Sequence, residues 1–137
     1  VYGFDAFEGL ADGGKWRGAP IHQDMFQHGG EIPFTVPSNG VITKGWFDKT
    51  LPGFDYGHAQ AKFMNIDCDN YQATVTVLNN VQQHIKPGTV IALDDYFNEY
   101  KYQGQTQFTA WDEFKKANNI KCEYLYCVAP AVIVKIL

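Results

Sequence analysis

The chain has 137 residues, of which 45% are hydrophobic and 19% charged, so it is long enough for one globular domain with a substantial core. Its formal net charge of −4 argues against a dedicated nucleic-acid binder, and no apolar run approaches the roughly 20 residues that span a bilayer. Three cysteines without CxxC spacing argue against a zinc cluster or a disulfide framework. We therefore expect free thiols in a reducing compartment, and a cytoplasmic protein.

The first half of the chain predicts strands separated by loops. An apolar run that ends at Asp5 predicts a first strand. Residues 8–40 are rich in Gly and Pro, which predicts loops with one short helix near His22–His28. Two further strands are predicted over residues 40–47 and 61–69.

The second half alternates strand and helix. Apolar residues at helical spacing predict helices over residues 70–85 and 108–119. Between them, "TVIAL" predicts a strand that is buried on both faces. The last apolar runs, 120–128 and 131–137, predict an antiparallel hairpin. This order predicts a single α/β domain that spans the whole chain, with helices on the faces of a sheet.

Carboxylates follow two of the predicted strands. Asp67 ends "FMNID", and Asp94 and Asp95 end "VIALDD". Ligands of open parallel sheets bind outside the carboxyl ends of the strands, so these three side chains should meet there. Their repulsion requires a counter-charge, and Mg²⁺ or Ca²⁺ fits better than a basic side chain because these segments contain no Arg. The alternative is that these acids are solvated loop residues. Asp69 or Asn70 can act as the N-cap of the next helix, and we expect Asp69 to be the cap.

Other polar and aromatic residues give weaker signals. His22 and His28 flank Asp24, but their spacing suits neither a helix face nor a strand face, which disfavours a metal site there. His58 is a candidate substrate contact, with an exposed loop as the alternative. Trp46 lies beside the proposed site, where an aromatic ring can contact a cofactor or substrate, although such rings are more often part of the core.

Four segments, "VYGFDAFEGL", "TKGWFDKTLP", "NIDCDNY" and "VIALDDYF", resemble successive motifs of the macrocin O-methyltransferase (TylF-like) family of class I S-adenosylmethionine (SAM)-dependent methyltransferases. The resemblance implies a Rossmann-like sheet, mostly parallel with a C-terminal antiparallel hairpin. It implies metal-assisted methyl transfer from SAM to a hydroxyl of a small molecule, such as a sugar-bearing natural product. It also implies that Asp5 holds the cofactor ribose, that Asp67 is a metal ligand or general base, and that Asp94 and Asp95 are paired metal ligands.

The chain departs from the family pattern in two places. The family begins with a strand, a glycine-rich turn and a helix that hold the methionine part of the cofactor, and the chain has no matching segment. We therefore expect an N-terminally truncated domain that is inactive by itself and binds SAM weakly or not at all. Because the absent strand normally lies inside the sheet, we expect a homodimer or a rearranged N-terminal strand. The second departure is "GQTQFT", where an acid is expected near Gln105–Gln107.

Two other functions stay open. The chain could be a non-catalytic α/β fragment that acts only through self-association. A phosphoacceptor receiver domain also clusters aspartates around Mg²⁺, but its paired acids come on the first strand, whereas here the lone Asp67 precedes the pair. Methyl transfer with and without Mg²⁺ separates the enzyme from the non-catalytic fragment.

Overall fold

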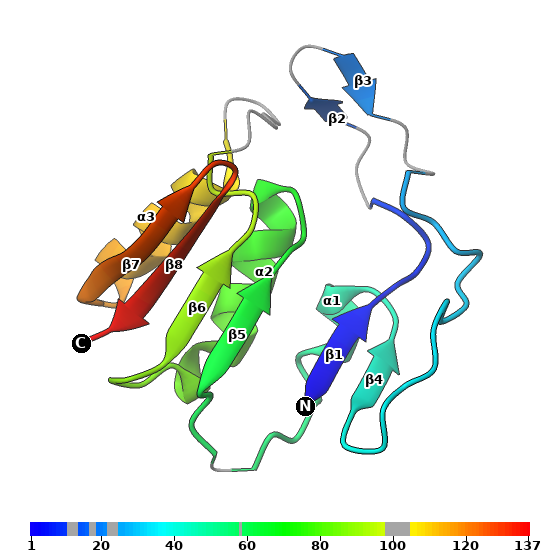
Figure 1. Cartoon of the computed structure of the whole chain (residues 1–137), viewed down its shortest axis with the longest axis horizontal. Coiled ribbons are helices and arrows are strands. Elements are labelled where there is room, and N and C mark those ends of the chain that lie inside the picture. The colour runs from blue at the N-terminus through cyan, green and yellow to red at the C-terminus, as the bar shows by residue number, and fades with distance from the viewer. Residues whose placement is uncertain (11–13, 17–18, 22–24, 58, 98–104) are drawn as a thin grey trace. The chain divides into compact units, whose positions relative to one another are not determined.

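The computed structural model describes the chain in two compact units, Val1–Asp55 (the N-terminal unit) and Tyr56–Leu137 (the C-terminal unit). The described residues are 1–10, 14–16, 19–21, 25–57, 59–97 and 105–137 (Figure 1).

The N-terminal unit contains a parallel strand pair and a hairpin. Strand β1 (Tyr2–Asp5) pairs in parallel with β4 (Val41–Lys44), which is followed by the short helix α1 (Phe47–Thr50) (Figure 1). Strands β2 (Gly14–Trp16) and β3 (Ala19–Ile21) form an antiparallel hairpin. The hairpin lies in the Gly- and Pro-rich segment for which the sequence predicted loops.

Two sequence predictions in this unit need correction. The helix predicted near residues 22–28 is not found in its described part, because residues 25–28 form a turn and an isolated bridge, while 22–24 lie outside the described residues. The strand predicted over 40–47 ends at Lys44. Gly45 follows with a φ of 139°, and Trp46 is the N-cap of α1, so the chain turns away from the sheet there.

The C-terminal unit is a four-stranded sheet with the order β5-β6-β8-β7. Strand β5 pairs in parallel with β6, whereas β8 lies antiparallel to both β6 and β7. Helices α2 and α3 pack against each other on one face of the sheet, and α2 continues into the 3-10 helix η1 (Figure 1). The bounds are β5 (Phe63–Ile66), α2 (Tyr71–Val81), η1 (Gln82–His84), β6 (Val90–Leu93), α3 (Gln107–Ala117), β7 (Cys122–Val128) and β8 (Ala131–Ile136).

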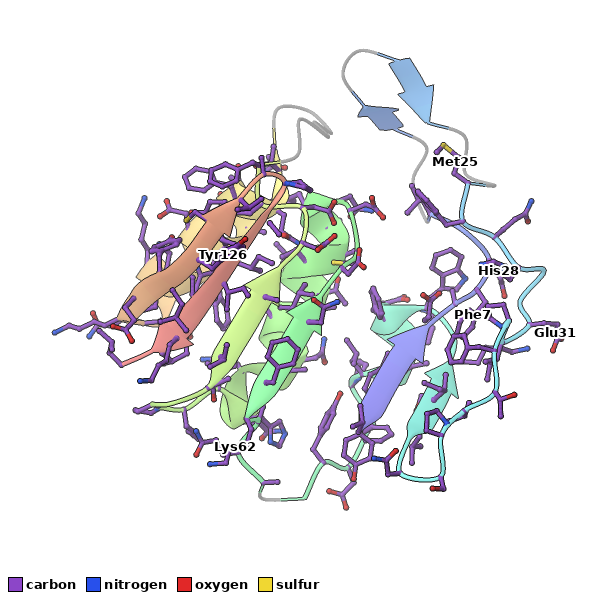
Figure 2. All side chains as sticks on the ribbon, viewed as in Figure 1. Phe7, Met25, His28, Glu31, Lys62 and Tyr126 are labelled. Carbon is purple, nitrogen blue, oxygen red and sulfur yellow. The ribbon has the colours of Figure 1, made fainter. Side chains whose placement is uncertain are left out.

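The core of this unit forms between the sheet and the two helices. Periodicity predicted that apolar side chains of the helices and strands would be buried. The large apolar side chains that are under 2% exposed come from both layers: Leu78, Ile91, Leu93, Trp111, Val132 and Val134. By contrast, the edge strand β7 carries exposed apolar side chains, among them Tyr126 (Figure 2). Strand β6 is therefore an inner, largely buried strand of the sheet.

The predicted α/β class and the C-terminal hairpin are confirmed. The expected mostly parallel sheet is found only in part: β1–β4 and β5–β6 pair in parallel, whereas the other described pairings, β2–β3, β6–β8 and β7–β8, are antiparallel. The physical reason is that β8 returns between β6 and β7, so one strand contributes two antiparallel pairings. Within the described part of the chain, no helix is both long and apolar enough to cross a membrane. The single-domain expectation stays a prediction.

Candidate acidic site at the ends of β5 and β6

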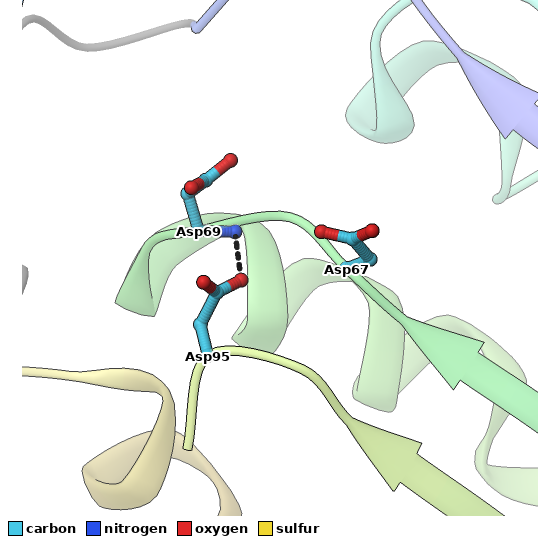
Figure 3. A group of neighbouring side chains, drawn as sticks. All are labelled: Asp67, Asp69 and Asp95. Atoms are coloured by element: carbon cyan, nitrogen blue, oxygen red, sulfur yellow. Dashed lines mark hydrogen bonds between the residues drawn. The ribbon is translucent and has the colours of Figure 1, made fainter. Parts of the chain in front are cut away.

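Three carboxylates meet beyond the C-terminal ends of β5 and β6. Asp67, Asp69 and Asp95, called the acidic cluster from here on, each offer an oxygen, and these oxygens lie within 4.8 Å of one another (Figure 3). Asp67 directly follows β5, and Asp95 is the second residue after β6. Since β5 and β6 are parallel neighbours, the loops that follow them leave the sheet at the same edge. The predicted meeting of Asp67 and Asp95 is thus observed.

The backbone at Asp69 brings the third carboxylate into the cluster. Asp69 has a φ of 61°, in the left-handed region that few residues other than glycine adopt, although Asp tolerates it better than most. Its N–H donates to Oδ2 of Asp95 at 2.9 Å (Figure 3). The loop after β5 is therefore tied to the loop after β6 through one of the clustered carboxylates.

The residue that caps α2 is Asn70 rather than Asp69, so the prediction for Asp69 was wrong. Oδ1 of Asn70 accepts the N–H of Ala73 at 2.8 Å. Asn70 has the extended backbone (φ −117°, ψ 163°) that an N-cap requires, whereas the left-handed backbone of Asp69 does not fit that position. The carboxylate of Asp69 is consequently available to the acidic cluster.

The electrostatics of the cluster indicate concentrated negative charge. The pKa of Asp69 is raised to about 6, first by burial and then by the negative charges of Asp95, Asp67 and Asp94. The carboxylates are graded in exposure, since Asp67 is exposed, Asp69 half-buried and Asp95 buried. Carboxylate oxygens are the donors that Mg²⁺ and Ca²⁺ prefer. The residues present therefore fit a hard divalent cation that is open to solvent on the Asp67 side.

Asp94 takes a different place from the one predicted. It is not a member of the acidic cluster, although its negative charge contributes to the raised pKa of Asp69. Its backbone N–H donates to the carbonyl of Ile66 at 3.1 Å, which extends the pairing of β5 and β6 by one residue. The assignment of Asp94 as a metal ligand stays a prediction, while Asp69 is the third carboxylate that the structure gathers.

Cys68 lies between Asp67 and Asp69 in the sequence, and its side chain is buried. Its Sγ lies 3.4 Å from Oγ1 of Thr74, whose hydroxyl donates to the carbonyl of Asn70 at 2.8 Å. Because a hydroxyl has a single proton, the Cys68 thiol is the donor to Thr74. Burial raises the pKa of Cys68 to about 12, and the neighbouring aspartates contribute to the rise. Cys68 is therefore a protonated structural thiol rather than a nucleophile.

Gln107, the first residue of α3, connects the two strand ends, and sequence reasoning missed it. Its Nε2 donates to the carbonyl of Ile66 at 3.1 Å, and its Oε1 accepts the N–H of Asp95 at 2.9 Å. The side chain is 1% exposed. The sequence did offer one signal: Gln107 is an uncharged polar residue next to the N-cap of α3, in a segment where the family pattern suggests an acid.

In the N-terminal unit, Asp5 is the last residue of β1 and Trp46 is the second residue after β4, so both lie at the C-terminal ends of this parallel pair. Oδ1 of Asp5 accepts the N–H of Phe7 at 2.7 Å, and the carbonyl of Asp5 accepts the N–H of Gly45 at 2.9 Å, next to Trp46. Asp5 is exposed and Trp46 is half-buried, so both can reach a ligand. Their assignment to cofactor binding stays a prediction.

The histidine candidates gain no support. His22, Asp24 and His58 lie outside the described residues. His28 is exposed, and its backbone N–H donates to the carbonyl of Phe7 at 2.8 Å (Figure 2). Among the residues that the structure describes, His28 joins no group of three potential metal ligands.

Comparison with known proteins decides the family. The family model described as macrocin O-methyltransferase (TylF) matches residues 36–129, more than half of the chain and including the whole acidic cluster. The chain belongs to the macrocin O-methyltransferase (TylF) family. A TylF family member thus carries clustered carboxylates at the ends of two parallel strands.

Relatives of known name are O-methyltransferases. The chain is 28% identical over 111 residues to the 8-demethyl-8-(2,3-dimethoxy-alpha-L-rhamnosyl)-tetracenomycin-C 4'-O-methyltransferase of Streptomyces olivaceus, a match that covers 70% of this chain and 41% of that protein. The solved structure of the O-methyltransferase NovP matches with a TM-score of 0.70 at 19% identity, covering 98% of this chain and 59% of NovP. The apo structure of CalS11, a TDP-rhamnose 3'-O-methyltransferase, matches with a TM-score of 0.62 at 16% identity, covering 98% and 58%.

These structural matches show a shared fold, that of part of a class I methyltransferase. The chain spans less than two thirds of the length of each of these relatives.

Proposed function

We propose that the chain is part of a metal-dependent, SAM-dependent O-methyltransferase that acts on a hydroxyl of a small molecule. The observation that carries the proposal is the convergence of Asp67, Asp69 and Asp95 in a member of the TylF family. Two of the named relatives, the Streptomyces olivaceus protein and CalS11, are named as methyltransferases of rhamnose-containing compounds, which supports a sugar-bearing natural product as the substrate class.

The proposed roles follow the exposure of the carboxylates. Asp95 and Asp69 are the more buried members, already joined by a hydrogen bond, and would hold Mg²⁺ or Ca²⁺ together with Asp67. Such an ion, when bound, lowers the pKa of a hydroxyl that contacts it. Asp67 is the exposed member and lies where a substrate hydroxyl can approach. We therefore propose that Asp67 acts as the general base that accepts the hydroxyl proton. The substrate oxygen then forms a bond to the methyl group as the bond from that carbon to the cofactor sulfur breaks.

Asp5 and Trp46 are the proposed cofactor contacts. The carboxylate of Asp5 can accept two hydrogen bonds from ribose hydroxyls, and the half-buried ring of Trp46 offers a face to the adenosine part. That the chain by itself binds SAM weakly or not at all stays a prediction. Calorimetry that gave tight 1:1 binding of SAM would contradict this expectation.

The enzyme proposal is tested by methyl transfer from methyl-labelled SAM to a panel of glycosylated aromatic compounds, with Mg²⁺ or with EDTA. Transfer that requires Mg²⁺ and is lost in Asp67→Asn would support the proposal. Transfer that is equal in EDTA would contradict the role of the acidic cluster.

A non-catalytic, self-associating chain is the second candidate. It is favoured by the exposed apolar side chains of the edge strand β7, because an exposed apolar edge strand is a template for pairing with another chain. A homodimer is expected for either candidate, and sedimentation of the chain measures it. A stable dimer that binds no divalent cation at the acidic cluster would favour this candidate, because the chain by itself is expected to transfer no methyl group in either case.

A further inference from the structure

We propose that Gln107 is a positioning residue that sets the separation between the strand ends that carry Asp67 and Asp95. This inference rests on the proposed function, because it concerns how the acidic cluster is assembled for a divalent cation. Both hydrogen bonds of the Gln107 side chain go to the backbone, one to Ile66, directly before Asp67, and the other to Asp95 itself.

The orientation of the Gln107 amide is determined by its partners. The carbonyl of Ile66 can only accept, so it must face the NH₂ group, and the N–H of Asp95 can only donate, so it must face Oε1. A flipped amide would place donor against donor and acceptor against acceptor. Because the side chain is buried, water does not compete for either bond. One side chain therefore adds two hydrogen bonds that hold the two strand ends together, next to the backbone bond from the Asp94 N–H to the same Ile66 carbonyl.

Gln107 is itself held in place by the start of α3. The N-cap Thr106 accepts the N–H of Thr109 at 3.3 Å, and Oγ1 of Thr109 accepts the N–H of Thr106 at 3.3 Å, which forms a reciprocal capping box. Ala110 and Trp111 follow, at 1% and 0% exposure, and anchor the first turn in the core. The position of α3 therefore determines, through the two hydrogen bonds of Gln107, where the loops after β5 and β6 lie.

A glutamine suits this position better than the acid that the family pattern suggests. A carboxylate at residue 107 would accept the N–H of Asp95, but its second oxygen would face the carbonyl of Ile66. It would also add a buried negative charge behind three carboxylates that already repel one another. Asparagine carries the same amide on a shorter side chain and would not span the two strand ends. The required chemistry is one donor and one acceptor on a side chain of this length.

The test compares Gln107→Met with a matched control, Thr89→Val. Methionine keeps the volume of the side chain and removes both hydrogen bonds. Thr89 is also fully buried, and its hydroxyl accepts the N–H of Lys86 at 3.1 Å and donates to the carbonyl of Ala61 at 2.8 Å. It therefore links the segments that precede β5 and β6, at the opposite ends of the same strands.

The first readout is the Kd for Mn²⁺, measured from the loss of the free-ion signal in electron paramagnetic resonance. We expect Gln107→Met to weaken Mn²⁺ binding about 10–100-fold, as removal of a residue that orients metal ligands does. We expect Thr89→Val to bind Mn²⁺ as the unchanged chain does, although its stability is also reduced. Equal Kd values for Gln107→Met and the unchanged chain would overturn the inference, as would equal weakening in both variants.

The second readout needs no metal and separates this inference from the proposed function. Exchange of the Asp69 amide hydrogen reports the bond from that N–H to Asp95. Gln107→Met should speed this exchange relative to the exchange of the amides within α2, while Thr89→Val should not. If the unchanged chain binds no Mn²⁺, the metal-dependent function fails, and the exchange result alone decides whether Gln107 positions Asp95. Unchanged Asp69 exchange in Gln107→Met would then reject the positioning role.

Discussion

The backbone N–H of Asp69 donates to the carboxylate of Asp95 at 2.9 Å, and this hydrogen bond joins the loops that follow two parallel strands. It explains how the carboxylates come to lie so close: the loop after β5 turns through a left-handed residue and brings both an N–H donor and a further carboxylate to one place. The arrangement gathers oxygen donors, and the repulsion among them is the cost that a bound cation would offset.

Asp95→Asn should reduce affinity for divalent cations without destabilising the chain. The amide oxygen of Asn can still accept the N–H of Asp69, and the repulsion within the acidic cluster decreases. We expect Mn²⁺ binding to weaken about tenfold or more, since a buried oxygen ligand loses its charge. Asp48→Asn is the control, because Asp48 is an exposed acid paired with Lys49 and lies outside the cluster. Equal Mn²⁺ affinity in the two variants would argue against the site.

The raised pKa of Asp69 predicts a pH-dependent stability. The folded chain holds the Asp69 proton up to about pH 6, whereas the unfolded chain releases it near the ordinary value of 3.8. Between these values the folded state binds more protons, so the contribution of Asp69 to stability falls as the pH rises and stays low above about pH 6. Asp69→Asn should therefore be stabilised relative to the unchanged chain at pH 7.5 but not at pH 4.

Urea unfolding of both chains at several pH values measures this difference. The comparison with the variant cancels the titration of the other acids, which also changes stability as the pH falls. A stability difference that is constant from pH 4 to 7.5 would show that Asp69 titrates normally.

Asn70→Ala should destabilise the chain by about 1 kcal/mol, because the cap of α2 is lost. Asn79→Ala is the matched control, since Asn79 is exposed within the same helix and Ala is a good helix former there. The free energy of unfolding in urea distinguishes the two variants. If both lose the same amount, the cap assignment is incorrect.

Gly45→Ala should destabilise the N-terminal unit by about 1–3 kcal/mol, because an L-residue would be strained at a φ of 139°. Its Cβ would also lie 2.9 Å from Cγ2 of Thr50. The variant should disturb Asp5 and Trp46 as well, since the N–H of Gly45 donates to the carbonyl of Asp5. Gly53→Ala, where a Cβ would meet no atom within 4 Å, should be nearly neutral in the same denaturation experiment.

Periodicity and the rules of parallel sheets predicted much of the C-terminal unit. The helical spacing of apolar residues located α2 and α3, and the two final apolar runs located the β7–β8 hairpin. The meeting of Asp67 with Asp95 followed from their positions at the ends of adjacent parallel strands. These features depend on local pattern and on a general rule, so sequence alone could predict them.

The remaining features depend on tertiary context. The sequence predicted Asp94 as the third carboxylate, whereas the structure places Asp69 in the acidic cluster. This difference results from the left-handed backbone at Asp69, which no propensity of Asp requires. The role of Gln107 depends on where α3 begins relative to the two strand ends. The β2–β3 hairpin was missed because Gly and Pro in that segment are equally compatible with loops.

Crystals of the chain soaked in Mn²⁺ and measured by anomalous diffraction test the central claim most directly. If the acidic cluster binds a divalent cation, we expect one strong anomalous peak between Asp67, Asp69 and Asp95, with metal–oxygen distances of about 2.1–2.2 Å. Crystals of Gln107→Met should show a weaker peak at the same place. No anomalous peak at these carboxylates, or a peak held by other residues, would contradict it.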